Sequence, residues 1–162
     1  MFDAGGSALA ATGFVHAMTI LAKIYPISTQ SYDAAMRGDF DHFEPIMKSR
    51  IDLDQYWHAI HYLLTGDATC TLLLSGTQLP IISDHAEVHP PASIRELYER
   101  VCDKSLDQIM ANFDPIRFDE LNIYRPLWSQ DQEPEIRKYL EIFLSKVKEA
   151  VEANQGFFII IM

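Results

Sequence analysis

The chain has 162 residues and 48% of them are hydrophobic, so one domain can bury a sizeable core without disulfides or metals. It has 13 Lys and Arg residues and 23 Asp and Glu residues, which gives a net charge of −10. A protein of that charge repels nucleic-acid phosphates and anionic membranes. The longest apolar run, Phe157–Met162, is too short to cross a bilayer. We therefore expect a cytoplasmic protein that contacts neither nucleic acid nor membrane.

Residues 1–17 do not resemble a secretory signal, because they lack Lys and Arg near the start and carry the acidic Asp3. We expect a disordered extension or an upstream start there, with the folded domain spanning residues 18–162. The cysteines, Cys70 and Cys102, are too few and too distant for a disulfide framework or a zinc motif. We expect both to be reduced thiols in or near the core.

The first predicted element is a strand at about residues 20–27, where β-branched and aromatic residues dominate. Pro26 near its end predicts an edge strand, because proline cannot donate a hydrogen bond to a neighbouring strand. Ser28 provides an N-cap for a helix that extends through Met36, with Gly38 as its stop. A short acidic and aromatic connector follows.

The next helix is predicted to run from Asp52 to Thr65. Asp52 and Gln55 have the spacing of a capping box, and Gly66 follows the helix as a stop. Apolar residues recur at helical spacing along one face: Leu53, Trp57, Ile60 and Leu64. This periodicity predicts that Trp57 points into the core.

The stretch from residue 67 to residue 92 is ambiguous. Thr69–Leu74 fits either a buried strand or one and a half helical turns. Prolines at positions 80, 90 and 91 then predict a loop. His85 and His89 lie in this polar loop, where we expect both to be exposed to solvent.

Helix starts in the C-terminal half carry capping residues. Two capping boxes and one Asp-Pro start are predicted, at Ser93 with Glu96, Ser105 with Gln108, and Asp114 with Pro115. A long helix begins near Pro134 and ends at Gly156. Its apolar face consists of Ile136, Leu140, Phe143, Leu144, Val147 and Val151. The closing run 157–162 is apolar at every position, which predicts a strand covered on both faces.

A strand near each end, with helices between them, requires the two end strands to meet in one sheet. We therefore predict a single compact α+β domain, in which amphipathic helices pack on a small sheet that includes strands at about 20–27 and 157–162.

Three segments together resemble the YfbM-like family of uncharacterised, mostly bacterial proteins. They are WHAIHYLLTG at 57–66, FDPIRFDELNIYRPLW at 113–128, and the closing helix followed by Gly156 and FFIIIM. The resemblance extends over residues 18–162, and residues 1–17 have no counterpart in it. It implies a compact α+β fold, and it implies no known activity, cofactor or catalytic residue.

The predicted helix places Asp54, His58, His61 and Thr65 on one polar stripe beside its apolar face. As a functional site, Asp54, His58 and His61 would form a metal or acid–base centre, since imidazoles and carboxylates bind zinc and exchange protons. The alternative is that the histidines pack at the boundary of the core and bond to backbone groups or to Asp54. We favour packing and expect no metal and no cofactor.

A second candidate is an aromatic and cationic group at Tyr124, Arg125 and Trp128, beside Trp57. These side chains fit a pocket for a small molecule or a surface for a protein. The alternative, which we favour, is that Trp128 anchors an irregular loop onto the core.

No phosphate-binding loop, nucleophile elbow or dinucleotide motif occurs in the sequence. We therefore expect a non-enzymatic domain that binds another protein, of basic charge, in the manner of an immunity protein or antitoxin. Two alternatives remain open: a small metal-assisted hydrolase that uses Asp54, His58 and His61, and a small-molecule sensor.

Overall fold

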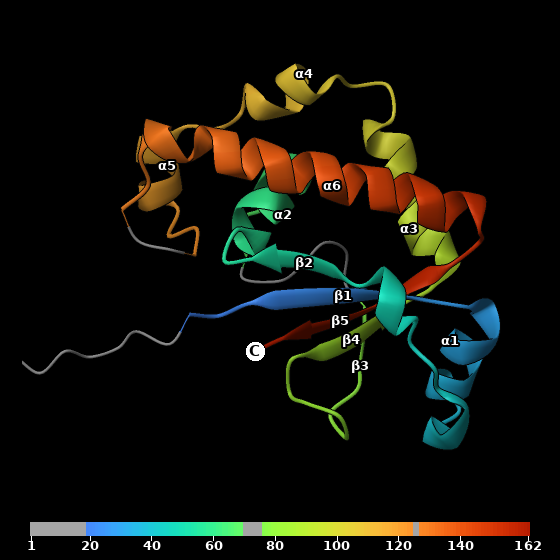
Figure 1. The fold of residues 1–162 in the computed structure, drawn as a ribbon. Helices are drawn as coiled ribbons and strands as arrows, with labels where there is room; N and C mark the ends of the chain where they lie inside the picture. Colours follow the sequence, from blue (N-terminus) through green and yellow to red (C-terminus); the bar gives the residue numbers. More distant parts are fainter. Residues whose placement is uncertain (1–18, 70–75, 125–126) are drawn as a thin grey trace, which may run out of the picture.

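The fold, seen here in a computed structural model that describes residues 19–69, 76–124 and 127–162, is a layer of helices on an antiparallel sheet (Figure 1). The sheet has five strands in the order β2-β1-β5-β4-β3. Their bounds are Ala22–Ile27 for β1, Ile51–Asp54 for β2, Thr77–Gln78 for β3, Ala86–His89 for β4 and Gly156–Ile161 for β5. Residues 1–17 and 70–75 lie outside the description, and with them most of the ambiguous stretch Thr69–Leu74.

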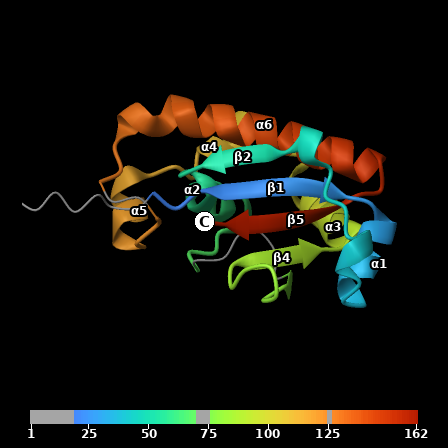
Figure 2. The same cartoon turned by 60° about the horizontal axis from the view of Figure 1, so that its bottom comes forward.

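The described residues form six α-helices. They are α1 (Thr29–Met36), α2 (Trp57–Thr65), α3 (Pro91–Val101), α4 (Leu106–Met110), α5 (Pro115–Glu120) and α6 (Glu133–Glu152). Figures 1 and 2 show that α2, α3 and the long α6 cover one face of the sheet, whereas α1 lies at its other face. The predicted class, a single compact α+β domain, is confirmed.

Strands β1 and β5 are neighbours in the middle of the sheet, so the two ends of the domain meet as predicted. Their register runs from Ala22 opposite Ile161 to Ile27 opposite Gly156. The prediction of an edge strand at Pro26 is wrong, because β2 pairs with β1 on its other side. That pairing stops at Ile24, and the Pro26 carbonyl accepts a hydrogen bond from the Ile46 N–H instead (2.9 Å). The proline therefore sits where the ladder requires no donor.

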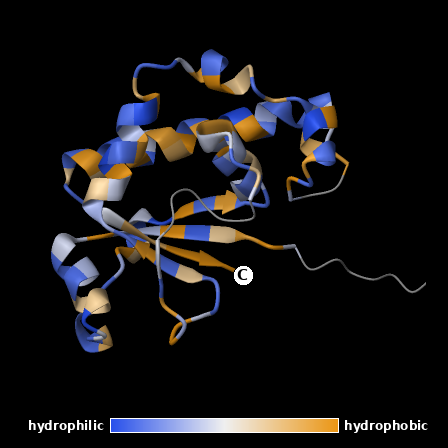
Figure 3. Cartoon of the chain, turned by 180° about the vertical axis from the view of Figure 1, so that it is seen from behind, coloured by the Kyte–Doolittle hydropathy of each residue, from blue (hydrophilic) through white to orange (hydrophobic). Residues whose placement is uncertain are grey.

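Alternation along the strands divides the core between the two faces of the sheet. The helical face buries Ile24, Phe157 and Ile159 together with the inner faces of α2, α3 and α6. The other face buries Tyr25, Ile27 and Phe158 together with Ala35 of α1 and Val88 of β4. In Figure 3 the apolar colouring accordingly gathers on the strands and on the inward sides of the helices.

The predicted start of the second helix at Asp52 is wrong. Ile51–Asp54 is strand β2, with Ile51 and Leu53 buried and Asp52 exposed, and α2 begins only at Trp57. The pairing of β2 with β1 outweighs the local capping pattern, since strand formation depends on neighbours distant in sequence. Trp57 nevertheless points into the core as predicted, with 1% of its surface exposed.

Three of the predicted helix caps are confirmed, and the long helix begins near Pro134 as predicted. The Ser28 hydroxyl accepts from Ser31 N–H (3.0 Å), Ser105 and Gln108 form a reciprocal capping box, and Asp114 caps α5. Ser93 does not cap α3, which begins two residues earlier at Pro91. Proline suits that first helical position, because its φ is fixed near the helical value and no N–H is needed there.

Gly156 is not the stop of the long helix as predicted. The helix ends at Glu152, Asn154 takes the positive φ of 50°, and Gly156 is the first residue of β5. A Cβ at position 156 would lie 2.2 Å from the His89 carbonyl oxygen, so glycine is required by the close approach of β4.

The predicted loop before α3 contains strand β4, and this corrects the expectation for His89. His89 is buried with 1% exposure instead of solvated, while His85 is exposed as predicted.

Cys102 is a free thiol exposed at the end of α3, not a core residue, and Cys70 lies outside the described residues. Within the described parts of the chain, no helix combines the length and the apolar character needed to span a membrane.

Candidate functional site

The two histidines of α2 are buried in the helical layer, and two backbone groups fix the ring of His58. Its Nδ1 accepts a hydrogen bond from Tyr124 N–H (2.8 Å), and its Nε2 donates to the Ala68 carbonyl (3.1 Å). These partners define the neutral tautomer with the proton on Nε2. Burial lowers the pKa of His58. Both ring nitrogens are therefore engaged, and neither is available to a metal or to a transferred proton.

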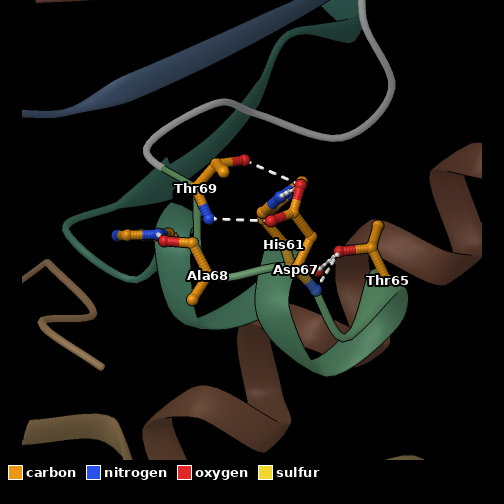
Figure 4. Close-up of polar contacts among 6 residues, drawn as sticks. His61, Thr65, Asp67, Ala68 and Thr69 are labelled. Carbon is orange, nitrogen blue, oxygen red and sulfur yellow. Dashed lines mark hydrogen bonds and ion pairs between the residues drawn. The ribbon is translucent and has the colours of Figure 1, made fainter. Parts of the chain in front are cut away.

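His61 lies one turn further along α2, with 1% of its surface exposed, and the two imidazole centroids are 6.3 Å apart. Burial lowers the pKa of His61 from 6.5 to about 4, so its imidazole is neutral at physiological pH. Its Nε2 lies 3.8 Å from a carboxylate oxygen of Asp67. Figure 4 draws the two side chains next to each other. His61 of α2 therefore lies beside the carboxylate of Asp67, which belongs to the loop that follows the helix.

Asp67 is held by the loop that follows α2 (Figure 4). Its carboxylate accepts hydrogen bonds from Thr69 N–H (2.9 Å) and from the Thr69 hydroxyl (2.7 Å), and the first of these is the main reason that the pKa of Asp67 is lowered. The Thr65 hydroxyl donates to the His61 carbonyl (2.8 Å) and accepts from Asp67 N–H (3.1 Å). The sequence-based prediction missed Asp67, for which the Gly66–Asp67 pair after the helix was the available signal.

Asp54 is not part of this group, contrary to the predicted stripe. It ends β2 with a φ of 50°, its Oδ1 accepts from Gln55 N–H (2.8 Å), and its Oδ2 lies 3.4 Å from the Tyr139 hydroxyl of α6. The predicted polar stripe required Asp54 to lie on the same helix as His58 and His61. Asp54 instead belongs to strand β2, which ends before α2 begins. Within the described residues, no group of three His, Cys, Asp or Glu side chains is placed to hold a metal ion.

The predicted aromatic binding residues are used inside the fold. The Trp57 ring stacks on His58 and on Tyr124, with centroids 5.2 and 5.7 Å apart. Its indole N–H donates to the Ile20 carbonyl (3.2 Å), while the Tyr124 hydroxyl accepts from Ile20 N–H (2.7 Å). These two side chains therefore hold the segment that leads into β1.

Trp128 anchors the loop after α5, as the favoured interpretation predicted. It is buried, its indole N–H donates to the Ile123 carbonyl (3.1 Å), and its ring packs edge-on against Phe118 at 5.2 Å. Its backbone N–H donates to the Asp119 carboxylate (3.1 Å). Arg125 lies outside the described residues.

A second buried histidine group, on β4, was missed because that segment was predicted to be a loop. His89 Nε2 lies 3.4 Å from a Glu87 carboxylate oxygen, and this contact is the main cause of the lowered pKa of Glu87. A Cβ at Gly76 would lie 2.7 Å from the same nitrogen. The alternation of Ala86 and Val88 with these two polar residues was the signal of a strand.

Comparison with known proteins identifies the family. The family model called domain of unknown function (DUF1877) matches residues 18–159. The chain belongs to the DUF1877 family. The resemblance drawn from the three sequence segments is thereby confirmed.

Among solved structures, the DUF1877 chain is similar to a protein of unknown function, YfbM from Escherichia coli. The TM-score is 0.56 at 14% sequence identity, and the match covers 88% of this chain and 99% of YfbM. At that identity the likeness extends to the fold alone. The comparison with curated protein sequences gave no match.

Proposed function

We propose that this protein is a non-catalytic domain that binds a basic protein through an acidic surface, in the manner of an immunity protein or antitoxin. The observation that carries the proposal is the net charge of −10 together with an α2 whose candidate catalytic groups are used in packing. Electrostatic complementarity of this kind accelerates association and selects partners of opposite charge.

The geometry of α2 supports a binding role over the metal-assisted hydrolase. Both ring nitrogens of His58 form hydrogen bonds with backbone groups, and the Asp54 carboxylate faces the Tyr139 hydroxyl. The hydrolase needed these two residues and His61 to converge on one point. The alternative of a sensor pocket at Trp57 is likewise unsupported, because that ring is fully packed in the core.

Acidic residues outnumber basic ones around α5. Between Phe113 and Glu135 the sequence has six carboxylates and two arginines. The same region exposes two large apolar side chains, Leu127 at 84% and Ile116 at 74%. We call the α5 surface the part of this exposed region that contains Asp114, Ile116, Arg117, Glu120, Leu127 and Asp131. Arg117 and Glu120 form an ion pair within it (3.2 Å).

Leu127 has the features of an anchor for a partner protein. Its φ of 65° is strained for a leucine, and such strain persists only where neighbours enforce it. The neighbour is Trp128, which is fixed to the core through its indole and through Asp119. Apolar anchors inside a charged rim contribute most of the binding energy in many interfaces.

The test is capture of partners by the immobilised full chain from a lysate of the source organism, followed by purification of each partner. We expect a partner of net positive charge whose affinity decreases as salt is raised. Replacing the anchor, Leu127→Asn, should weaken binding about tenfold or more, and asparagine tolerates the left-handed backbone at that position.

The matched control is Ile142→Gln on α6, a residue 43% exposed and outside the α5 surface, which should leave the affinity unchanged. The proposal fails if no partner is retained. It also fails if the partner is acidic, or if neither salt nor Leu127→Asn changes its affinity.

A further inference from the structure

A cavity of about 280 Å³ lies where the start of β1, strand β2 and helix α6 meet. Charged and polar side chains line it, namely Lys23, Arg50, Asp52, Asp54 and Tyr139. Leu21 and Ala22 supply its apolar wall. This volume is slightly below the range typical of sites for drug-sized ligands, so the cavity suits a smaller molecule.

The four charged groups of this cavity do not neutralise one another completely. Arg50 pairs with Asp52, with an Nη2 to Oδ2 distance of 2.9 Å and a second contact from Nε at 3.1 Å. Across the described parts of the chain, neither Lys23 nor Asp54 has an oppositely charged side chain within 4.0 Å. One cation and one anion are therefore left to face the same cavity at a separation greater than ion-pair distance.

The backbone and α6 together orient the Asp54 carboxylate. Its Oδ1 accepts from Gln55 N–H (2.8 Å), and its Oδ2 faces the Tyr139 hydroxyl at 3.4 Å. Burial, followed by the charge of Asp54, raises the pKa of Tyr139, so the phenol keeps its proton and remains a donor. A carboxylate oxygen has more than one lone pair, and Oδ2 can accept another donor beside Tyr139.

We propose that this cavity binds a free α-amino acid. The ammonium group of such a ligand fits the Asp54 carboxylate, and its carboxylate fits the Lys23 ammonium, so that one zwitterion bridges the two unpaired charges. The side chain of the ligand then lies toward Leu21 and Ala22, which favours a small apolar residue. None of the residues that line this cavity belongs to the α5 surface, and the proposal is independent of the protein-binding role.

The experiment is calorimetric titration of the full chain with each of the twenty common L-amino acids. We expect saturable binding of at least one with a small apolar side chain. Lys23→Gln and Asp54→Asn should each weaken it about tenfold or more, because each removes one charged hydrogen bond. Asparagine keeps the acceptor for Gln55 N–H and tolerates the backbone of Asp54, so that variant preserves the fold.

Two controls separate this site from adventitious binding. Lys104→Gln and Asp103→Asn are exposed changes elsewhere that should leave the affinity unchanged. The methyl ester and the deaminated acid of the ligand should both fail to bind, since each lacks one of the two charges. Absence of saturable binding for all twenty amino acids, full affinity in both cavity variants, or equal binding of either analogue would overturn the proposal.

Discussion

The depressed pKa of His61 predicts that acid weakens the fold. Burial lowers that pKa from 6.5 to about 4, so between these values the unfolded chain binds a proton that the folded chain excludes. The contribution of neutral His61 is therefore fully present above pH 6.5 and is lost as the pH falls toward 4. At about 1.4 kcal/mol per pKa unit, the loss reaches about 2–3 kcal/mol by about pH 4.5.

The perturbation that isolates this effect is His61→Leu, which keeps an apolar group in the core and removes the titration. The assay is urea unfolding followed by tryptophan fluorescence, from about pH 7.5 to about pH 4.5. Carboxylates titrate in both proteins, so their contribution cancels in the difference. The stability of the wild-type protein relative to the variant should decrease by about 2–3 kcal/mol across this range.

A matched control is His85→Leu, because His85 is exposed and should follow the wild-type pH dependence. If the difference between wild type and His61→Leu stays within about 0.5 kcal/mol over the whole range, His61 is not a buried neutral base and the reasoning is refuted.

Three further predictions concern stability and are checked by urea unfolding at neutral pH. His58→Leu leaves the partly buried Tyr124 N–H without its acceptor, and we expect the free energy of unfolding to fall by about 2–4 kcal/mol. A loss equal to that of His85→Leu would contradict the bridging role. Gly156→Ala forces a methyl group against the β4 backbone and should lower the free energy of unfolding by about 1–3 kcal/mol or more. An unchanged urea midpoint would contradict the close approach of the two strands. Ser105→Ala removes a helix cap and should lower the free energy of unfolding by about 1 kcal/mol. Ser93→Ala removes no cap and should change that free energy by less than about 0.5 kcal/mol. Equal effects of the two substitutions would show that the assigned caps are wrong.

Local patterns predicted those parts of the fold that depend on neighbouring residues. The capping box of Ser105 and Gln108 and the Asp114 cap form entirely within one turn, and both are found as predicted. The apolar closing run likewise determined a buried strand, since such a run must be covered on both faces.

Where pairing across the sheet decides the structure, local patterns failed. Residues 51–54 carry both an alternating apolar pattern and a capping pattern, and the bonding of Lys23 with Asp52 in the ladder selects the strand. Strand β4 was not predicted for the same reason, because its partner β5 is distant in sequence. Without that strand, the burial of His89 could not be predicted either.

The candidate site was predicted in part for the same reason. Periodicity correctly brought His58 and His61 together, because both belong to one helix. It could not reveal that Tyr124 and Ala68 occupy the nitrogens of His58, since those partners are backbone groups of two separate loops. The wrong placement of Asp54 on the helix was the basis of the less favoured alternative, a metal centre, whereas packing of the imidazoles was the favoured interpretation.

The placement of β5 beside β1 has a consequence for biosynthesis. The middle of the sheet is built from the first and last strands of the domain, and β4 docks on the last of them. A nascent chain therefore cannot complete this sheet until β5 has emerged from the ribosome. We expect the domain to fold slowly for its size, because the contacts at the centre of the sheet join residues that are far apart in the sequence.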